Sequence, residues 1–148
     1  MKYPPHITER IARISEPAPV GIRLDTSSAV VAVARGFLDG REVECVVCIA
    51  LDSKMRVIDA DIMTTGTHDC ALFDTRQILR WALTRKRPAS GIIIAHNHPS
   101  GEASPSWNDD DVTRKCGQAC TAVGIKLHDH IITTDGEAFY SYAGSRNL

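Results

Sequence analysis

The feature that most constrains the fold is an apolar run, Ile92–Ala95, that passes directly into the letters His-Asn-His-Pro. The run has no polar face, which predicts a strand in the middle of a sheet with both sides covered. His96 and His98 follow at its carboxyl end, where open α/β sheets usually carry their ligand sites. The sequence therefore predicts a layered fold with a functional site at this strand end.

Hydrophobic periodicity, turn residues and caps predict elements in the order α-β-β-α-β-α-β-β. We expect helices at Thr26–Leu38, from Asp74 to about Lys86, and at Ser106–Val123, with a short helical segment at Thr8–Ile14. We expect strands at Val43–Leu51, Arg56–Thr65, Ser90–Ala95, Lys126–Thr134 and Glu137–Tyr142. This order predicts an α/β (α+β) fold, a three-layer arrangement of a mixed β-sheet with flanking helices. We expect residues 26–148 to form one domain, preceded by an arm or short helix at residues 1–25.

The composition is that of an ordinary soluble globular chain. Its 148 residues are 43% hydrophobic and carry a formal net charge of −1. No apolar run approaches the roughly 20 residues of a membrane span, and the first residues lack the apolar segment of a secretory signal. The near-neutral charge does not favour non-specific nucleic-acid binding. We expect a cytoplasmic protein without membrane association.

The five cysteines do not indicate a disulfide framework or a thiolate metal site. Cys45 and Cys48 lie three apart on a predicted strand, so their side chains point to opposite faces and make a poor chelate. Cys116 and Cys120 lie four apart on an apolar helical stripe and are expected to be core thiols. A reduced, intracellular environment fits this pattern.

His96 and His98 form a good half of a metal site. Residues two apart on an extended chain point the same way, so both imidazoles can converge on one point. Pro99 favours the extended conformation of the residues before it. A catalytic zinc needs a third protein ligand and an open position for water.

The helix that follows selects the third ligand. Its apolar stripe is expected to contain Val112, Cys116, Ala119, Cys120 and Val123. At about 100° per residue, Asp109 falls within roughly 40° of the centre of this stripe, whereas Asp110 and Asp111 lie more than about 120° away. An inward carboxylate needs a partner, and a cation held by two histidines would be one. Ser106 lies three residues before Asp109 and can face the same pocket.

A simpler interpretation of the same residues stays open. The letters Ser-Trp-Asn-Asp, residues 106–109, also form a capping box in which Ser106 is the N-cap, and a box alone would explain both of its residues. The histidine pair before it and the predicted orientation of Asp109 favour the metal site, and the two interpretations are compatible.

The spacing His96-x-His98, seven residues, Ser106, two residues, Asp109 resembles the JAMM (MPN+) metallopeptidase motif H-x-H-x7-S-x2-D. The surrounding letters AHNHPSG, HDHII and LDSKMRVI resemble the RadC-like JAB domain family, as do Gly66-Thr67 and Arg76. The resemblance runs from about residue 26 to residue 142. It implies a JAB/MPN fold, whose layered architecture is similar to that of cytidine deaminases.

The resemblance also implies a mechanism and a base. JAMM proteins use an upstream glutamate as the general base, and the matching position here is Glu44. Glu42 lies two residues earlier on the same strand face and is the competing candidate. One Zn²⁺ per chain on the two histidines and Asp109 would lower the pKa of water toward about 7. Glu44, expected to be poorly solvated, would take the proton, and Ser106 would stabilise the oxyanion of a cleaved peptide or isopeptide bond.

Asp129 and His130, in the letters HDHII, are candidates to hydrogen-bond the metal ligands on the side away from the metal. Alternatively, they form a buried polar pair whose hydrogen bonds are made within the core. His128 is expected to have no role in the site. RadC-like proteins typically carry an N-terminal helix-hairpin-helix region, and we expect this chain to be a stand-alone JAB domain without it. The family name is tied to DNA repair, which these residues do not themselves support. We expect an unknown peptide or protein substrate, and exposed strand edges make a homodimer plausible.

Three alternatives to a hydrolase require different sequence features. An HNH nuclease normally spreads its three residues over a larger element and needs a basic face. A zinc deaminase needs H-x-E with P-C-x-x-C, and neither occurs here. A non-catalytic metal-binding or interaction module is the serious alternative, and the presence of both Glu44 and Ser106 favours the enzyme.

Overall fold

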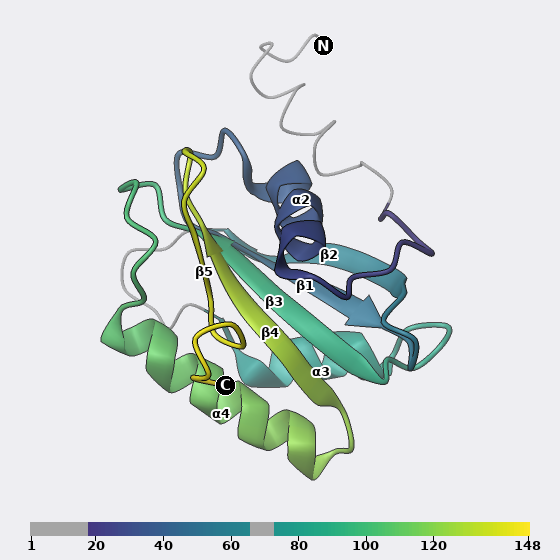
Figure 1. Ribbon diagram of the computed structural model, residues 1–148. Helices are drawn as coiled ribbons and strands as arrows, with labels where there is room; N and C mark the ends of the chain where they lie inside the picture. The colour runs from purple at the N-terminus through teal and green to yellow at the C-terminus, as the bar shows by residue number, and fades with distance from the viewer. Residues whose placement is uncertain (1–17, 66–72) are drawn as a thin grey trace, which may run out of the picture.

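The computed structural model describes residues 18–65 and 73–148, which form a five-stranded mixed sheet with helices on both faces (Figure 1). The strands are β1 (Cys45–Leu51), β2 (Val57–Thr65), β3 (Gly91–Asn97), β4 (Lys126–Thr133) and β5 (Phe139–Ser141). The helices are α2 (Ser27–Leu38), α3 (Thr75–Leu83) and α4 (Trp107–Ala122). The predicted three-layer α/β fold is confirmed. Across these residues, no helix has both the length and the apolar character needed to cross a membrane.

The spatial order of the strands is β2-β1-β3-β4-β5. β1 runs antiparallel to β2 and to β3, whereas β3 and β4 are parallel and are joined through α4. The ladder between β1 and β3 pairs Val46 with His96. The start of β1 therefore lies beside the carboxyl end of β3, and the residues just before β1 are brought to the histidines.

Two apolar cores lie on opposite faces of the sheet, and β3 contributes to both. Ile92 and Ile94 pack toward α3 and α4, whereas Ile93 packs toward α2. Each of these fully buried isoleucines contributes about 1.5–3 kcal/mol relative to an exposed one, which accounts for the central place of β3. Cys45 and Cys48 also belong to different cores, as the alternation of a strand predicts.

Element boundaries differ from the prediction by a few residues. β3 continues through His96 and Asn97 instead of ending at Ala95. α3 ends at Leu83, before Lys86, and its C-cap is Thr84, whose hydroxyl donates to the carbonyl of Arg80 at 2.8 Å. The expected short helix at residues 8–14 and the Gly-Thr pair at residues 66–67 lie outside the described residues.

The inner stripe of α4 is shorter than predicted. Val112, Cys116 and Cys120 are buried, and the Cys116 and Cys120 sulfurs lie 4.0 Å apart. Val123 is 47% exposed, which corrects the prediction, because it is the C-cap of α4 and the chain turns at Gly124 with φ +78°. The four described cysteines are free thiols.

Candidate metal centre

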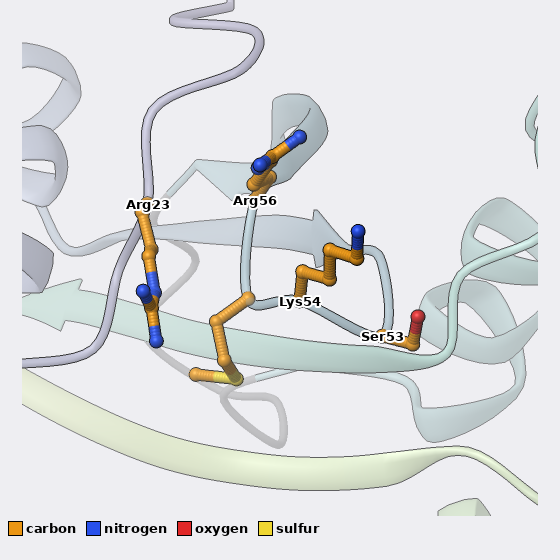
Figure 2. A pocket seen from close by; sticks show the side chains of 5 residues that line it. Arg23, Ser53, Lys54 and Arg56 are labelled. Atoms are coloured by element: carbon orange, nitrogen blue, oxygen red, sulfur yellow. The ribbon is translucent and has the colours of Figure 1, made fainter.

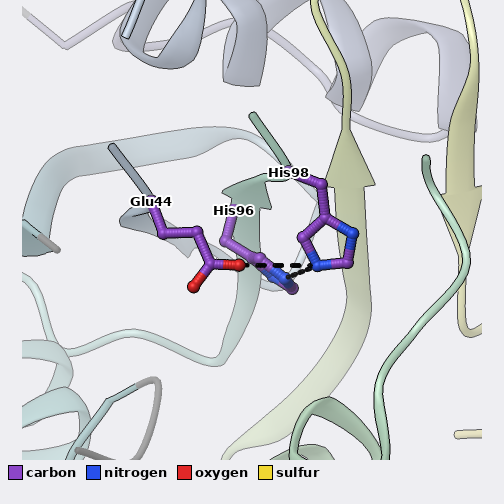
Figure 3. A group of neighbouring side chains, drawn as sticks. All are labelled: Glu44, His96 and His98. Carbon is purple, nitrogen blue, oxygen red and sulfur yellow. Dashed lines mark hydrogen bonds and ion pairs between the residues drawn. The ribbon is translucent and has the colours of Figure 1, made fainter. Parts of the chain in front are cut away.

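His96 and His98 converge at the carboxyl end of β3, as predicted. Their Nε2 atoms lie 3.0 Å apart, and Figure 3 shows both rings turned toward one point. His96 is completely buried because β1 and β4 flank it in the sheet. His98 follows the strand, and its backbone N–H still donates to the carbonyl of Thr133, which keeps the chain extended. The strand end therefore fixes both imidazoles by its backbone.

Asp109 is brought to the same point by the first turn of α4. Its residue is 3% exposed, Asp110 is exposed and Asp111 is half-buried, so the predicted inward orientation of Asp109 is confirmed. Oδ1 of Asp109 lies 3.4 Å from Nε2 of His96, and Oδ2 lies 3.3 Å from Nε2 of His98. Both ring nitrogens thus face one carboxylate.

The capping box is also present. The Asp109 N–H donates to Oγ of Ser106 at 3.1 Å, and the Ser106 N–H donates to Oδ2 of Asp109 at 2.7 Å. The two interpretations of this sequence segment are therefore compatible, because the box orients the carboxylate that faces the histidines. Oδ1 is the oxygen of Asp109 that the box leaves to the centre.

Glu44 approaches from the residues before β1. Its Oε1 lies 3.7 Å from Nε2 of His98 (Figure 3), whereas Glu42 is an exposed residue two positions earlier. The Glu44 side chain is 45% exposed, so the expectation of a poorly solvated carboxylate is wrong: this residue precedes the buried strand and lies at the surface. Glu44, His96 and His98 offer ligand atoms within 4.8 Å of one another and could hold a metal ion.

The charges of His98 and Asp109 depend on each other. The hydrogen bond with Asp109 raises the pKa of His98 above its usual value, although partial burial opposes this. Burial of Asp109 disfavours its ionised form, but its contacts with His96 and His98 outweigh burial and hold the pKa of the carboxyl well below the usual range. Without a cation, these contacts favour an ionised Asp109 beside a protonated His98, and a bound metal ion would displace the His98 proton.

Nδ1 of each imidazole is hydrogen-bonded on the side away from the centre, so it is Nε2 that faces the centre. Nδ1 of His98 lies 2.8 Å from the carbonyl oxygen of Glu102, and a carbonyl can only accept. Nδ1 of His96 lies 2.8 Å from Nε2 of His130. His98 therefore carries a proton on Nδ1, and the protonation of His96 depends on the state of His130.

Thr113 determines that state. Its Oγ1 lies 2.5 Å from the carbonyl of Asp109, which can only accept, and 2.6 Å from Nδ1 of His130. The hydroxyl has one proton and gives it to the carbonyl, so His130 must donate from Nδ1. Burial, followed by the charge of His96, lowers the pKa of His130 well below its usual value, so its Nε2 is unprotonated and accepts from Nδ1 of His96. In its neutral form, His96 would therefore carry its proton on Nδ1 and face the centre with the lone pair of Nε2.

His130 and Asp129 occupy different places in the fold. His130 contacts His96 and stacks on Tyr142 with ring centroids 5.1 Å apart. Asp129 faces the opposite way and accepts hydrogen bonds from the Ser141 hydroxyl at 2.6 Å and from the Ala143 N–H at 3.0 Å. Of this pair, His130 touches a residue of the centre, and Asp129 fastens β4 to the segment around β5.

The sequence patterns did not single out two buried polar residues beside this site, Thr113 and Asn97. Thr113 lies one helical turn after Asp109, so the same helical periodicity that selected Asp109 could have found it. Asn97 must point away from its two histidine neighbours because strand residues alternate, and a buried amide needs partners. The position of Asn97 between the two histidines could therefore have indicated a buried amide with hydrogen-bond partners on the other side of the strand.

A hollow lies at the opposite end of the sheet. It has a volume of about 430 Å³ and is lined by Arg23, Ser53, Lys54, Met55 and Arg56 at the β1–β2 turn. Figure 2 shows the Arg23 side chain extending away from those of Lys54 and Arg56. The positive charges diverge and form no common binding point, whereas the side chains at the histidine end converge.

The chain is similar to a family of bacterial proteins. The family model described as RadC-like JAB domain matches residues 24–147. A UPF0758 protein of Azotobacter vinelandii is 36% identical over 132 residues, which cover 89% of this chain and 55% of that protein. A UPF0758 protein of Alcanivorax borkumensis is 34% identical over 123 residues, 83% of this chain and 54% of that protein.

A shorter match has higher identity. A UPF0758 protein of Streptococcus sanguinis is 40% identical over 99 residues, which cover 67% of this chain and 42% of that protein. The chain thus spans about half the length of the curated relatives it matches. Their shared name states no reaction.

Proposed function

Because this chain belongs to the RadC-like JAB domain family, we propose that it is a zinc-dependent hydrolase that cleaves a peptide or isopeptide bond with water. The substrate would be a peptide or a protein. The match of its histidines, serine and aspartate to the JAMM motif supports the class of reaction, and the arrangement of these side chains supports the metal.

The spacing of the donor atoms carries the proposal. Zinc bonds of about 2.0–2.1 Å in a tetrahedral site keep the ligand atoms about 3.3–3.4 Å apart. The Nε2 atoms of His96 and His98 and the Asp109 oxygens are 3.0, 3.3 and 3.4 Å apart. Without a metal, a protonated His98 pairs with Asp109 at this distance, and a zinc ion between the same atoms would take the place of that proton. His96, His98 and Asp109 would therefore hold the zinc.

Two further residues would take part in the reaction: Glu44 would transfer a proton, and Ser106 would stabilise the negative charge on the substrate oxygen. Bound zinc supplies Lewis acidity and lowers the pKa of water toward about 7. Glu44, 3.7 Å from His98 and half-exposed, can accept a proton from water and give it to the leaving amine. Oγ of Ser106 accepts the Asp109 N–H, which leaves its own proton free to donate to the oxyanion of the substrate.

The first test is the zinc content of protein purified without added metal. We expect one zinc per chain in the parent and its loss in His96→Ala and in Asp109→Asn. His128→Gln and Asp111→Asn are matched controls, because His128 and Asp111 are no members of the proposed ligand set, and they should retain the metal. Fluorogenic peptides and a lysine isopeptide then test cleavage, with Glu44→Gln expected to keep zinc and to lose about 10²–10⁴-fold in kcat.

Each outcome has a defined meaning. Zinc that persists in both ligand variants would refute the metal assignment. Loss of zinc in Glu44→Gln would make Glu44 a ligand instead of a proton acceptor, as its place beside His96 and His98 also allows. Bound zinc without cleavage of either substrate class would favour a non-catalytic metal-binding module.

A further inference from the structure

The side chain of Asn97 makes the hydrogen bonds to the neighbouring segment of the chain that a backbone pair would make elsewhere in the sheet. The ladder between β1 and β3 ends at the pair Val46 and His96, and Asn97 is the next residue of β3. The residue is 4% exposed, and its side chain is hydrogen-bonded to the segment that enters β1. Oδ1 accepts the N–H of Cys45 at 2.7 Å, and Nδ2 donates to the carbonyl of Val43 at 3.0 Å.

These two contacts bracket Glu44. The Val43 carbonyl belongs to the peptide unit on the amino side of Glu44, and the Cys45 N–H belongs to the unit on its carboxyl side. We propose that Asn97 is a positioning residue that fixes the backbone of Glu44 and thereby sets the reach of its carboxylate to the metal centre. This inference rests on the proposed role of Glu44 as proton acceptor.

The side chain of Glu44 needs such a support. It is 45% exposed, and the nearest histidine nitrogen lies 3.7 Å away, so burial does not restrict its rotamers. Residues 41–44 have no regular secondary structure that would fix the backbone by ladder bonds. The position of the carboxylate therefore depends on the peptide units on either side, which are those that Asn97 holds.

The same residue also joins the base to the metal ligands. The backbone of Asn97 lies between His96 and His98 and pairs with Thr133 of β4. One residue thus carries the two ligands on its main chain and the Glu44 segment on its side chain. A shift of this strand end would move the base and the ligands together, and their relative geometry would be kept.

Amide hydrogen exchange tests the bridge in zinc-free protein. In Asn97→Leu, which removes both contacts at similar size, the Cys45 amide should exchange about 10-fold faster, the effect of one hydrogen bond, while Val47 and Ala50 stay protected. Asn97→Ala removes both contacts without adding bulk, and serves if Asn97→Leu does not fold. Asn147→Leu, at an exposed hydrogen bond to Tyr140, is the control. Unchanged Cys45 exchange in both Asn97 variants would overturn the bridge.

A double-mutant cycle tests the role in chemistry. Asn97→Leu should lower kcat by about 100-fold, the effect of a 1 Å misplacement, with KM and zinc content unchanged. In a Glu44→Gln background it should cause no further loss, because it acts through Glu44. An equal loss in both backgrounds, or loss of zinc, would refute the positioning role. A parent that cleaves no substrate would refute the proposed function, whereas the exchange experiment would still decide whether Asn97 holds the Glu44 backbone.

Discussion

Nε2 of His130 lies 2.8 Å from Nδ1 of His96, although the two residues are 34 positions apart in the chain. Neither ring is accessible to solvent, so neither nitrogen can exchange its partner for water. A histidine ligand whose second nitrogen donates to a fixed acceptor is oriented and made more basic. If His96 binds zinc as proposed, the pair therefore links the sheet interior to the strength of metal binding.

His130→Phe should weaken zinc binding about 10–100-fold, the usual effect of removing such a partner. Phenylalanine keeps the ring that stacks on Tyr142 and leaves the Nδ1–H of His96 buried without an acceptor. Competition with a chromogenic chelator measures the affinity, and His128→Gln is the control. An affinity equal to that of the parent would show that His130 only fills the core.

Thr113→Val should produce a smaller loss, about 10-fold in zinc affinity. Valine has the shape of threonine but cannot accept the Nδ1–H of His130, so the imidazole no longer prefers the tautomer that accepts from His96. Nitrogen-15 chemical shifts of the His130 ring report the tautomer directly. A ring that keeps its proton on Nδ1 in the variant would contradict the assignment of Thr113.

Ser106 has two separable tasks, capping and donation to the oxyanion. Ser106→Ala should lower the free energy of unfolding by about 1 kcal/mol, whereas Ser106→Gly should cost only a few tenths, because glycine is tolerated at an N-cap. Both remove the hydroxyl, so both should lower kcat by about 10²–10³-fold. Urea unfolding and peptide cleavage measure the two effects. A Gly variant with parental activity would leave Ser106 with capping alone.

Asp52 should make stability depend on pH at the β1–β2 turn. The Arg56 and Lys54 N–H groups donate to its carboxylate and lower its pKa. A lowered folded-state pKa stabilises the fold above the unfolded value, about 3.9, and this contribution is lost as the pH falls through the folded value. Asp52→Ala should therefore be less stable than the parent at pH 7. In urea titrations the difference should shrink toward pH 2.5, and a constant difference would exclude the carboxylate charge as its source.

Local patterns were sufficient for the elements and for the inward ligand. Helical periodicity selects Asp109 over its two acidic neighbours because only one residue in that group can face the sheet. Strand alternation likewise places His96 and His98 on one side. These relations depend on a few consecutive residues, so the sequence alone determines them.

The parts that were missed depend on contacts between distant segments. The exposure of Glu44 follows from the way the chain enters β1, and the contact of Asn97 with Val43 spans 54 residues. The bond between Thr113 and His130 requires α4 to lie across β4 in one register. Such placements result from the packing of the whole domain, and the local periodicity of the sequence carries no information about that packing.

The proposed ligands and their supports all belong to one β3–α4–β4 crossover, whereas Glu44, the proposed proton acceptor, precedes β1, on a segment that reaches the crossover only through the sheet. Under the proposed function, metal binding and proton transfer are therefore separately heritable. Substitutions confined to the segment before β1 would give variants that still bind the metal but lack the proton acceptor and the hydrolase activity. A new acidic residue in that segment would restore the activity. For protein engineers, a crossover that binds zinc as proposed would be a transplantable unit to which a different reactive group could be added from the neighbouring strand.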